Sequence, residues 1–239
     1  MRFNFLRKTM SKDNKAPIDS LLEPKQTAAN LELWIKQNSK IVIAVIAIII
    51  LIPLAYLGYQ KYIQEPKETE AYSAMFPAEQ YFQQENWQAA LDGGADFSGF
   101  LTIADEFGGT KAGNLSHYYA GICYLKLEKY PEAIEQLEDF SSDDILVSSV
   151  AYGALGDAYR ESGDSENAVK NYEKAANNKP NNFTSPIYLK KAGLTYEDDL
   201  QDLDKALACF EKIEKEYPNT KEGQEIMKYI VQVKAKKGE

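Results

Sequence analysis

Residues 149–182, SVAYGALGDAYRESGDSENAVKNYEKAANNKPNN, are the stretch that decides the fold of this chain. Small and aromatic residues stand at fixed places in it, and the same frame recurs on both sides. As a result Gly121, Gly156 and Gly193 lie 35 and 37 residues apart. Self-similarity at this period is typical of repeat architectures. Each repeat is a helical pair that cannot bury its apolar face alone, so the pattern predicts a stacked α-solenoid.

The central copy resembles a tetratricopeptide repeat (TPR). Small residues are expected where the two helices of a hairpin touch, and aromatic residues where the space between them widens. The resemblance implies a scaffold that binds protein partners on the concave face formed by the first helix of each hairpin. The positions that match the pattern W-x2-L-G-x2-Y, then Ala, an aromatic, Ala and Pro, are Tyr152, Leu155, Gly156, Tyr159, Ala168, Tyr172, Ala175 and Pro180.

We therefore predict an all-α protein with one N-terminal transmembrane helix, about four TPR-type hairpins and a C-terminal capping helix. A degenerate first repeat, interrupted at 92–99, precedes copies at about 114–143 and 149–182, and a fourth follows. The last helix, 221–237, should bury Ile226, Ile230 and Val233. The predicted organisation is a flexible cytoplasmic tail over 1–23, a juxtamembrane segment over 24–40, a span over 41–59, a linker over 60–70 and a periplasmic TPR domain over 71–239.

The predicted span begins at Ile41 and runs to Leu57 without a charge, and Gly58 and Tyr59 extend it. About 20 such residues cross a bilayer core. A cleaved signal peptide is the alternative, but the run is longer than a signal's apolar region and no small-x-small site follows it. Pro66 should break or kink the helix beyond it. The residues expected at the two membrane interfaces are Trp34, Lys36, Lys40, Tyr59 and Lys61.

Charge suggests how the span is oriented. The flank before it holds more lysine and arginine than the flank after it, so the positive-inside rule places the N-terminus in the cytoplasm. In a bacterium the repeats would then lie in the periplasm. The whole chain carries a net charge of −9, and this acidic character argues against nucleic acid as a partner.

Nothing in the sequence predicts an enzyme, a cofactor or a metal centre. His117 is the single histidine and stands where the repeat pattern has Trp, so it is expected to be a packing residue. Cys123 and Cys209 lie in different repeats without a C-x-x-C motif, and a disulfide between them is not expected. The acidic pairs at 143–144 and 198–199 indicate solvated turns, with weak divalent-cation binding as the alternative.

A groove that binds a partner is predicted on the concave face. The alternative is that other helices of the chain cover part of this face. An exposed apolar groove usually marks a partner site. Tyr118 and Ile122 stand where clamps for chaperone carboxylate tails have Lys and Asn, so that type of ligand is not expected. The predicted groove residues are Tyr72, Met75, Phe82, Tyr118, Ile122, Leu125, Asp157, Arg160, Ile187 and Leu194.

The overall layout resembles the YfgM-type ancillary proteins of the bacterial Sec translocon. The residues that carry this resemblance are the lead-in Leu33-Trp34-Ile35-Lys36 with Lys40, one span, and an acidic TPR body with a Glu216-Tyr-Pro-Asn-Thr element near its end. It implies a non-enzymatic adaptor in the inner membrane, with a SecYEG-type translocon and a periplasmic PpiD-type chaperone as partners. A scaffold of another envelope assembly or secretion machine, and a holdase that binds unfolded envelope proteins directly, remain alternatives.

Overall fold

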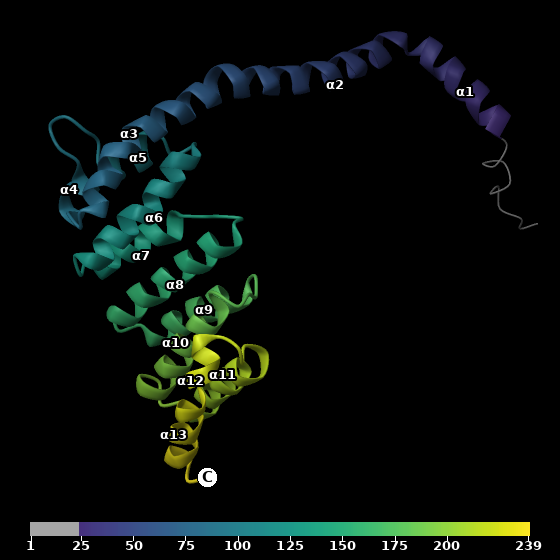
Figure 1. Ribbon diagram of the computed structural model, residues 1–239. Coiled ribbons are helices and arrows are strands. Elements are labelled where there is room, and N and C mark those ends of the chain that lie inside the picture. Colours follow the sequence, from purple (N-terminus) through teal and green to yellow (C-terminus); the bar gives the residue numbers. More distant parts are fainter. Residues whose placement is uncertain (1–23) are drawn as a thin grey trace, which may run out of the picture. The chain divides into compact units, whose positions relative to one another are not determined.

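The computed structural model describes residues 24–239, and the tail predicted for 1–23 lies outside the described residues (Figure 1). The chain divides into two units, Met1–Lys61 and Tyr62–Glu239. Every named element in the described part is helical, and the one β-bridge, Gly93 with Ser98, is isolated. The all-helical prediction is therefore confirmed for these residues.

The first unit contains α1 (Pro24–Gln37) and α2 (Ser39–Tyr59). They are separated at Asn38, whose side-chain amide donates to the Trp34 carbonyl at 2.9 Å. The 21 residues of α2 rise about 32 Å, which matches a bilayer core of about 30 Å. Its side chains are exposed, as Ile49 and Ile52 show at 64% each. This segment makes the helix Ser39–Gln83 the one candidate membrane span among the described residues.

The predicted linker over 60–70 is helical instead. Gln60–Gln64 form a π-helical turn, and α3 (Glu65–Gln83) follows without a loop. Pro66 does not break the helix because it occupies the first turn of α3, where a missing N–H costs little. The wider π turn just before it lets the chain continue without that donor.

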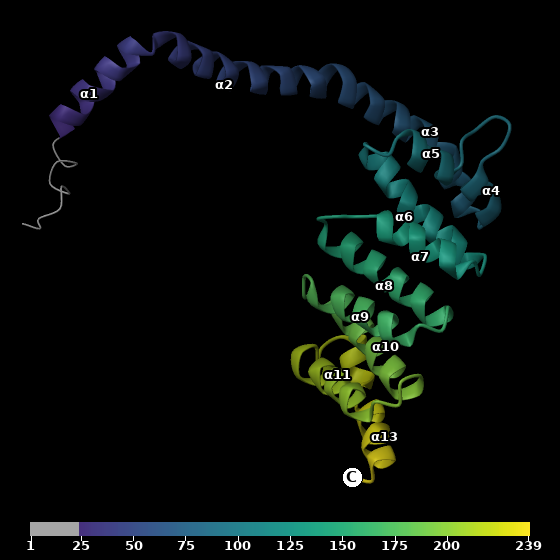
Figure 2. The same ribbon diagram turned by 180° about the vertical axis from the view of Figure 1, so that it is seen from behind.

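The second unit is a solenoid of helical hairpins (Figure 2). We call α3, α6, α8 and α10 the A helices, and the elements that complete their hairpins the B helices. As predicted, the first B helix is interrupted, and the C-terminal segment is helical but divides at Ile226. The hairpins are α3 with α4 (Trp87–Asp92) and α5 (Phe100–Glu106), α6 (Lys111–Lys126) with α7 (Tyr130–Asp139), α8 (Ile145–Glu161) with α9 (Ser165–Asn177), and α10 (Ser185–Asp198) with α11 (Leu203–Glu216), followed by α12 (Lys221–Glu225) and α13 (Met227–Lys237).

Each glycine of the repeat frame lies against a large side chain of its own B helix. A Cβ atom on Gly121 would lie 2.5 Å from Leu137 Cγ, and one on Gly193 would lie 2.3 Å from the Phe210 ring. Real Cβ atoms do not approach so closely, so the A and B helices meet at distances that only glycine allows. The small-against-large packing predicted from the sequence is confirmed.

The turn between the two helices of each hairpin contains one residue with left-handed backbone. Gly163 has φ +87°, and the corresponding residues Glu85, Glu128 and Gln201 have φ 59°, 60° and 54°. Gln201 lies one place further from its frame glycine than Glu128 and Gly163 lie from theirs, so that turn is one residue longer. Left-handed backbone is disfavoured for side chains other than glycine, so these turns are held by the packing of the helices they connect.

The C-terminal helix α13 is tied to α10 and α11. It buries Ile230 and Val233, with Ile226 just before it, as predicted. Glu197 of α10 is completely buried, and its Oε1 accepts from Lys236 and Gln232 of α13 at 2.7 Å each. Because an unpaired buried carboxylate is costly, these contacts fix the position of the cap.

Three aspartates cap helices of the solenoid, and we expect them to make stability depend on pH. Backbone N–H groups donate to Asp144, Asp164 and Asp202 and hold the pKa of each carboxyl below its usual value of about 3.8. Because the pKa of each carboxyl is lower in the folded protein than in the unfolded chain, the ionised carboxyl stabilises the fold. This stabilisation is fully present above the unfolded pKa and is lost as pH falls through the folded pKa.

Changing all three to asparagine should therefore retain stability at neutral pH, since asparagine also caps helices, and reduce its loss below about pH 4. Urea unfolding of both forms from pH 7 to 3 would measure this. Identical pH profiles for the two forms would contradict the expectation.

Candidate functional site

The A-helix face is the candidate partner site. It is the surface formed by α3, α6, α8 and α10, of which α3 contacts α6, and α8 contacts both α6 and α10. The small residues at the hairpin contacts are Ala78, Gly121, Gly156 and Gly193. The residue six places before each of them holds the same position in its A helix. An apolar side chain stands there each time, and three of the four are 37–45% exposed. We call Tyr72, Leu115, Val150 and Ile187 the apolar row.

Two further exposed apolar side chains lie beyond the end of the apolar row, Leu146 on α8 and Phe183 in the loop before α10. Leu146 is 47% exposed and precedes Val150 by four residues, while Phe183 is 76% exposed and precedes Ile187 by four. Sequence reasoning missed Val150, Leu146 and Phe183. The signal was present, because the same count from Gly156 reaches Val150, and Leu146 and Phe183 lie four residues before Val150 and Ile187.

Four of the predicted apolar groove residues are less available. Tyr118, Ile122 and Leu125 of α6 are half-buried against the core cluster that includes Ala154 and Ala158 of α8. Leu194 is half-buried against the C-terminal cluster. They contribute to the A-helix face mainly by packing neighbouring hairpins together.

Two predicted groove residues do not face the groove. Met75 is 2% exposed, and its sulfur lies 3.5 Å from Ser116 Oγ on α6. Phe82 belongs to an aromatic cluster, with its ring centroid 5.0 Å from that of Trp87 and 4.9 Å from that of Tyr119. The Met75 prediction was wrong because the short, interrupted B helix of the first hairpin leaves α3 to pack directly on α6, whereas Phe82 is half-buried against the same core.

The polar residues predicted for the groove are paired within the chain. Asp157 accepts from Lys191 at 2.7 Å and from the Tyr172 hydroxyl at 2.6 Å. Arg160 donates to Asp199 at 2.7 Å. Partly exposed pairs of this kind contribute little to stability. They link α8 to α10 and to the turn after α10, whereas Tyr72, Val150 and Ile187 of the apolar row stay 37–45% exposed and Leu115 packs partly against the N-terminal core.

The structure brings no catalytic or metal-binding group together in the part of the chain that it describes. His117 is half-buried, with Nδ1 2.9 Å from Gln136 Oε1. No cluster of three or more metal-ligating side chains occurs among the described residues. Burial raises the pKa of the Cys123 and Cys209 thiols to about 12, which keeps both unreactive. Of the acidic pairs, Asp144 caps α8 and Asp199 holds Arg160.

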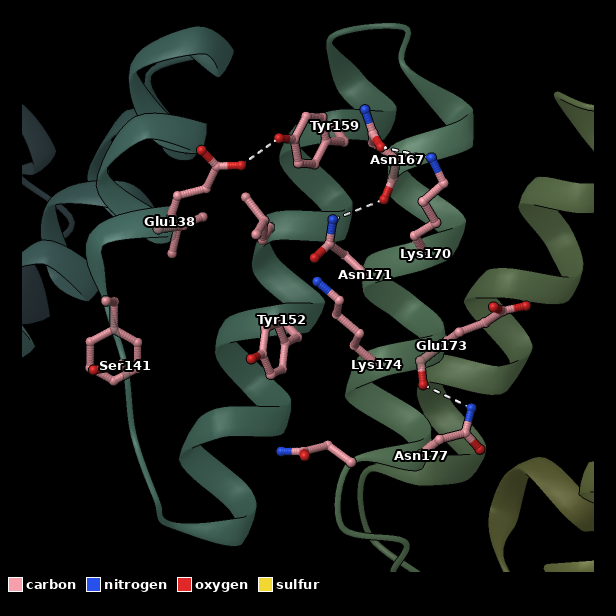
Figure 3. A pocket seen from close by; sticks show the side chains of 14 residues that line it. Glu138, Ser141, Tyr152, Tyr159, Asn167, Lys170, Asn171, Glu173, Lys174 and Asn177 are labelled. Carbon is pink, nitrogen blue, oxygen red and sulfur yellow. Dashed lines mark hydrogen bonds between the residues drawn. The ribbon is translucent and has the colours of Figure 1, made fainter.

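A second hollow lies on the outside of the solenoid, between α7 and α9 (Figure 3). It is an open groove of about 1080 Å³, and Tyr152, Leu155 and Tyr159 of α8 form its floor. Tyr159 donates to Glu138 at 2.6 Å, and Lys174 Nζ lies 5.6 Å from the centre of the Tyr152 ring. These side chains interact with one another across the groove, so it offers fewer unengaged groups than the apolar row.

The predicted membrane-interface residues surround α2. Trp34 and Tyr59 are each 52% exposed, and Lys36 pairs with Glu32 at 2.8 Å. Lys40 lies in the first turn of α2, and Lys61 lies in the π-helical turn after it. Their placement at a membrane interface stays a prediction.

Comparison with known proteins identifies the repeats. Residues 149–182 and 191–220 match two tetratricopeptide-repeat family models. The solenoid is similar to the crystal structure of nearly identical TPR-like repeats from a Podosopora anserina protein assigned as a kinesin light chain. The TM-score is 0.54 at 13% identity over 72% of this chain and 88% of that one. A point variant of the same protein gives a TM-score of 0.50 at 14% identity, over 72% and 97%. No curated protein matches this sequence.

The chain thus contains a TPR-type solenoid, a class of scaffold that mediates protein–protein interactions and is generally non-enzymatic. It also contains one helix long and apolar enough to be a candidate membrane span. At this level of identity the structural likeness shows the fold alone.

Proposed function

We propose that this protein is a membrane-anchored adaptor that binds a protein partner on its A-helix face. The observation that carries the proposal is the apolar row. Its members are partly exposed in a folded solenoid, whereas Asp157 and Arg160 of the same face are paired within the chain. Burying such side chains under a partner gains about 25 cal/mol for each Å² of apolar surface.

The spacing of the apolar row suits an elongated partner segment. Neighbouring packed helices lie about 8–10 Å apart, so four A helices present a row on the order of 25–30 Å long. An amphipathic helix of roughly 16–20 residues covers that length, and its apolar side chains recur along one face. An adaptor role needs no catalytic group, in agreement with the paired polar side chains of this face.

The anchor and the layout support a more specific role. With α2 as a single span, the positive-inside rule places the solenoid outside the cytoplasm, in the periplasm of a bacterium. The resemblance to YfgM-type proteins then favours an ancillary subunit of a Sec-type translocon that recruits a periplasmic chaperone to emerging chains.

Replacing Val150 and Ile187 by aspartate should reduce partner capture at least about tenfold, because two charges would have to be desolvated under the partner. The measurement is affinity purification of the full-length chain in mild detergent, with quantitative mass spectrometry of what is recovered. Val231→Asp is the matched control, because Val231 is 59% exposed on α13, outside the apolar row. Unchanged capture by the double variant would place the partner site elsewhere.

The same experiment tests the identity of the partner. Recovery of translocon subunits and a periplasmic chaperone supports the translocon role. Recovery of outer-membrane assembly or secretion components without translocon would overturn that role and leave an adaptor of another envelope machine.

A further inference from the structure

We infer that one edge of the solenoid rests on a lipid bilayer surface and inserts Ile145, Leu146 and Phe183 into it. The inference rests on the proposed membrane anchor and concerns an edge that adjoins the partner site, since Leu146 and Phe183 lie one turn beyond the apolar row. It follows from how the hairpins are joined, from where exposed apolar side chains gather, and from the distribution of charge.

The solenoid has two edges of different construction (Figure 1). The loops 107–110, 140–144 and 178–184, which lead from one hairpin to the next, lie on one edge, which we call the loop edge. The turns within hairpins lie on the opposite, turn edge. The start of α3 belongs to the loop edge, because Gln64 donates to the Gly109 carbonyl at 2.8 Å and Glu68 accepts from the backbone of Lys111 at 2.9 Å.

Exposed apolar side chains gather on the loop edge. Ile145 and Leu146 begin α8 and are 49% and 47% exposed, and Phe183 in the loop before α10 is 76% exposed. The two segments are neighbours, since Lys179 Nζ contacts the Asp143 carbonyl oxygen. None of the large exposed hydrophobic side chains lies in the turns within hairpins 84–86, 127–129, 162–164 and 199–202.

The loop edge is less acidic than the turn edge, and this favours an orientation in which the loop edge faces an anionic bilayer. The charged residues of the three loops are Asp143, Asp144 and Lys179, a net charge of −1, whereas the turns within hairpins carry −4. The turn edge is predominantly acidic, and an anionic lipid surface repels it. The charged residues of the turns are Glu85, Glu128, Lys129, Asp164, Asp199 and Asp202.

The covalent chain keeps the start of α3 near the end of the span. Tyr62, the first residue of the solenoid unit, follows Tyr59 at the end of α2 by three residues. Glu65, the first residue of α3, follows Tyr59 by six residues, which reach at most about 22 Å, so the start of α3 lies within that distance of the end of the span. Exposed aliphatic and aromatic side chains on an edge close to the bilayer are stabilised when they enter the boundary between headgroups and acyl chains.

The test uses the full chain reconstituted in phosphatidylethanolamine–phosphatidylglycerol liposomes that contain doxyl-labelled lipid. An environment-sensitive fluorophore is attached to Leu146→Cys, Phe183→Cys or Ser162→Cys in separate samples. The native cysteines are buried, and an unsubstituted sample measures any background labelling. Ser162 is the matched control, because it is exposed in the turn at the other end of α8, about 24 Å along that helix from Leu146.

We expect doxyl lipid to quench about half or more of the fluorescence at Leu146→Cys and Phe183→Cys, and about a tenth or less at Ser162→Cys. Adding Phe183→Asp should reduce quenching at Leu146→Cys, whereas adding Val231→Asp should not, and circular dichroism checks that each variant is helical.

The outcomes separate this inference from the proposed function. If the chain does not float with liposomes after extraction at high pH, the anchor itself fails. If the chain floats but both edge labels remain unquenched, the anchor stands and the lipid contact is overturned. Equal quenching at all three positions, or shielding of the edge labels only when a membrane protein is co-reconstituted, would also overturn it.

Discussion

Replacing Phe210 by alanine is expected to lower the free energy of unfolding of the solenoid by about 3–5 kcal/mol. The Phe210 side chain is completely buried, and its ring lies against Gly193 and 5.5 Å from the Tyr229 ring centre. The cavity left by the ring cannot close, because glycine has no side chain to move into it. Urea unfolding followed by circular dichroism at 222 nm measures the loss.

A conservative change tests the cause of this effect. Phe210→Leu keeps most of the buried volume and should cost much less than Phe210→Ala. Because a solenoid is stabilised by contacts between neighbouring repeats, hydrogen exchange should increase first in α10, α11 and α13. A loss below about 1 kcal/mol for Phe210→Ala would show that this contact is not the centre of the C-terminal core.

Replacing Gly156 by leucine is expected to destabilise the solenoid by at least about 1–3 kcal/mol through overpacking. A Cβ atom there would lie 2.6 Å from the Tyr172 ring. The ring cannot turn away cheaply, since Tyr172 is 1% exposed and its hydroxyl donates to Asp157 at 2.6 Å. The midpoint of thermal unfolding gives the size of the effect.

Gly109→Ala is the matched control for that experiment. A Cβ atom on Gly109 meets nothing within 4 Å, so its replacement should change stability by less than about 0.5 kcal/mol. If Gly156→Leu were as harmless as Gly109→Ala, the close helix contact would not be the reason for glycine at that place.

The repeat frame made much of the solenoid predictable. Small residues such as Gly121 and their large partners such as Leu137 recur at intervals set by one hairpin, and the structure places them in contact. The first hairpin was harder to predict, because its B helix is divided by a loop and its A helix, α3, packs directly on α6. That difference is why Met75, predicted for the groove, is found in the core and Phe82 is half-buried against it.

The candidate site was only partly predictable. Tyr72 and Ile187 were identified from the repeat frame and are exposed. Val150 was not among the predicted residues. On the same helix Asp157 and Arg160 were predicted instead, and the structure shows them paired with Lys191 and Asp199. Which charges of a face are paired depends on side chains from neighbouring helices, and sequence spacing within one helix does not reveal it.

By itself the sequence determined the helical class, the hairpin period and the candidate span, because each depends on interactions along one helix or within one hairpin. Local periodicity is enough for that, since a helix repeats every 3.6 residues and a bilayer sets a length of about 20. Only the tertiary structure decided that Glu197 is buried under α13 and that exposed apolar side chains gather on one edge. These features depend on which surfaces of separate hairpins cover one another, and that is settled when the hairpins pack.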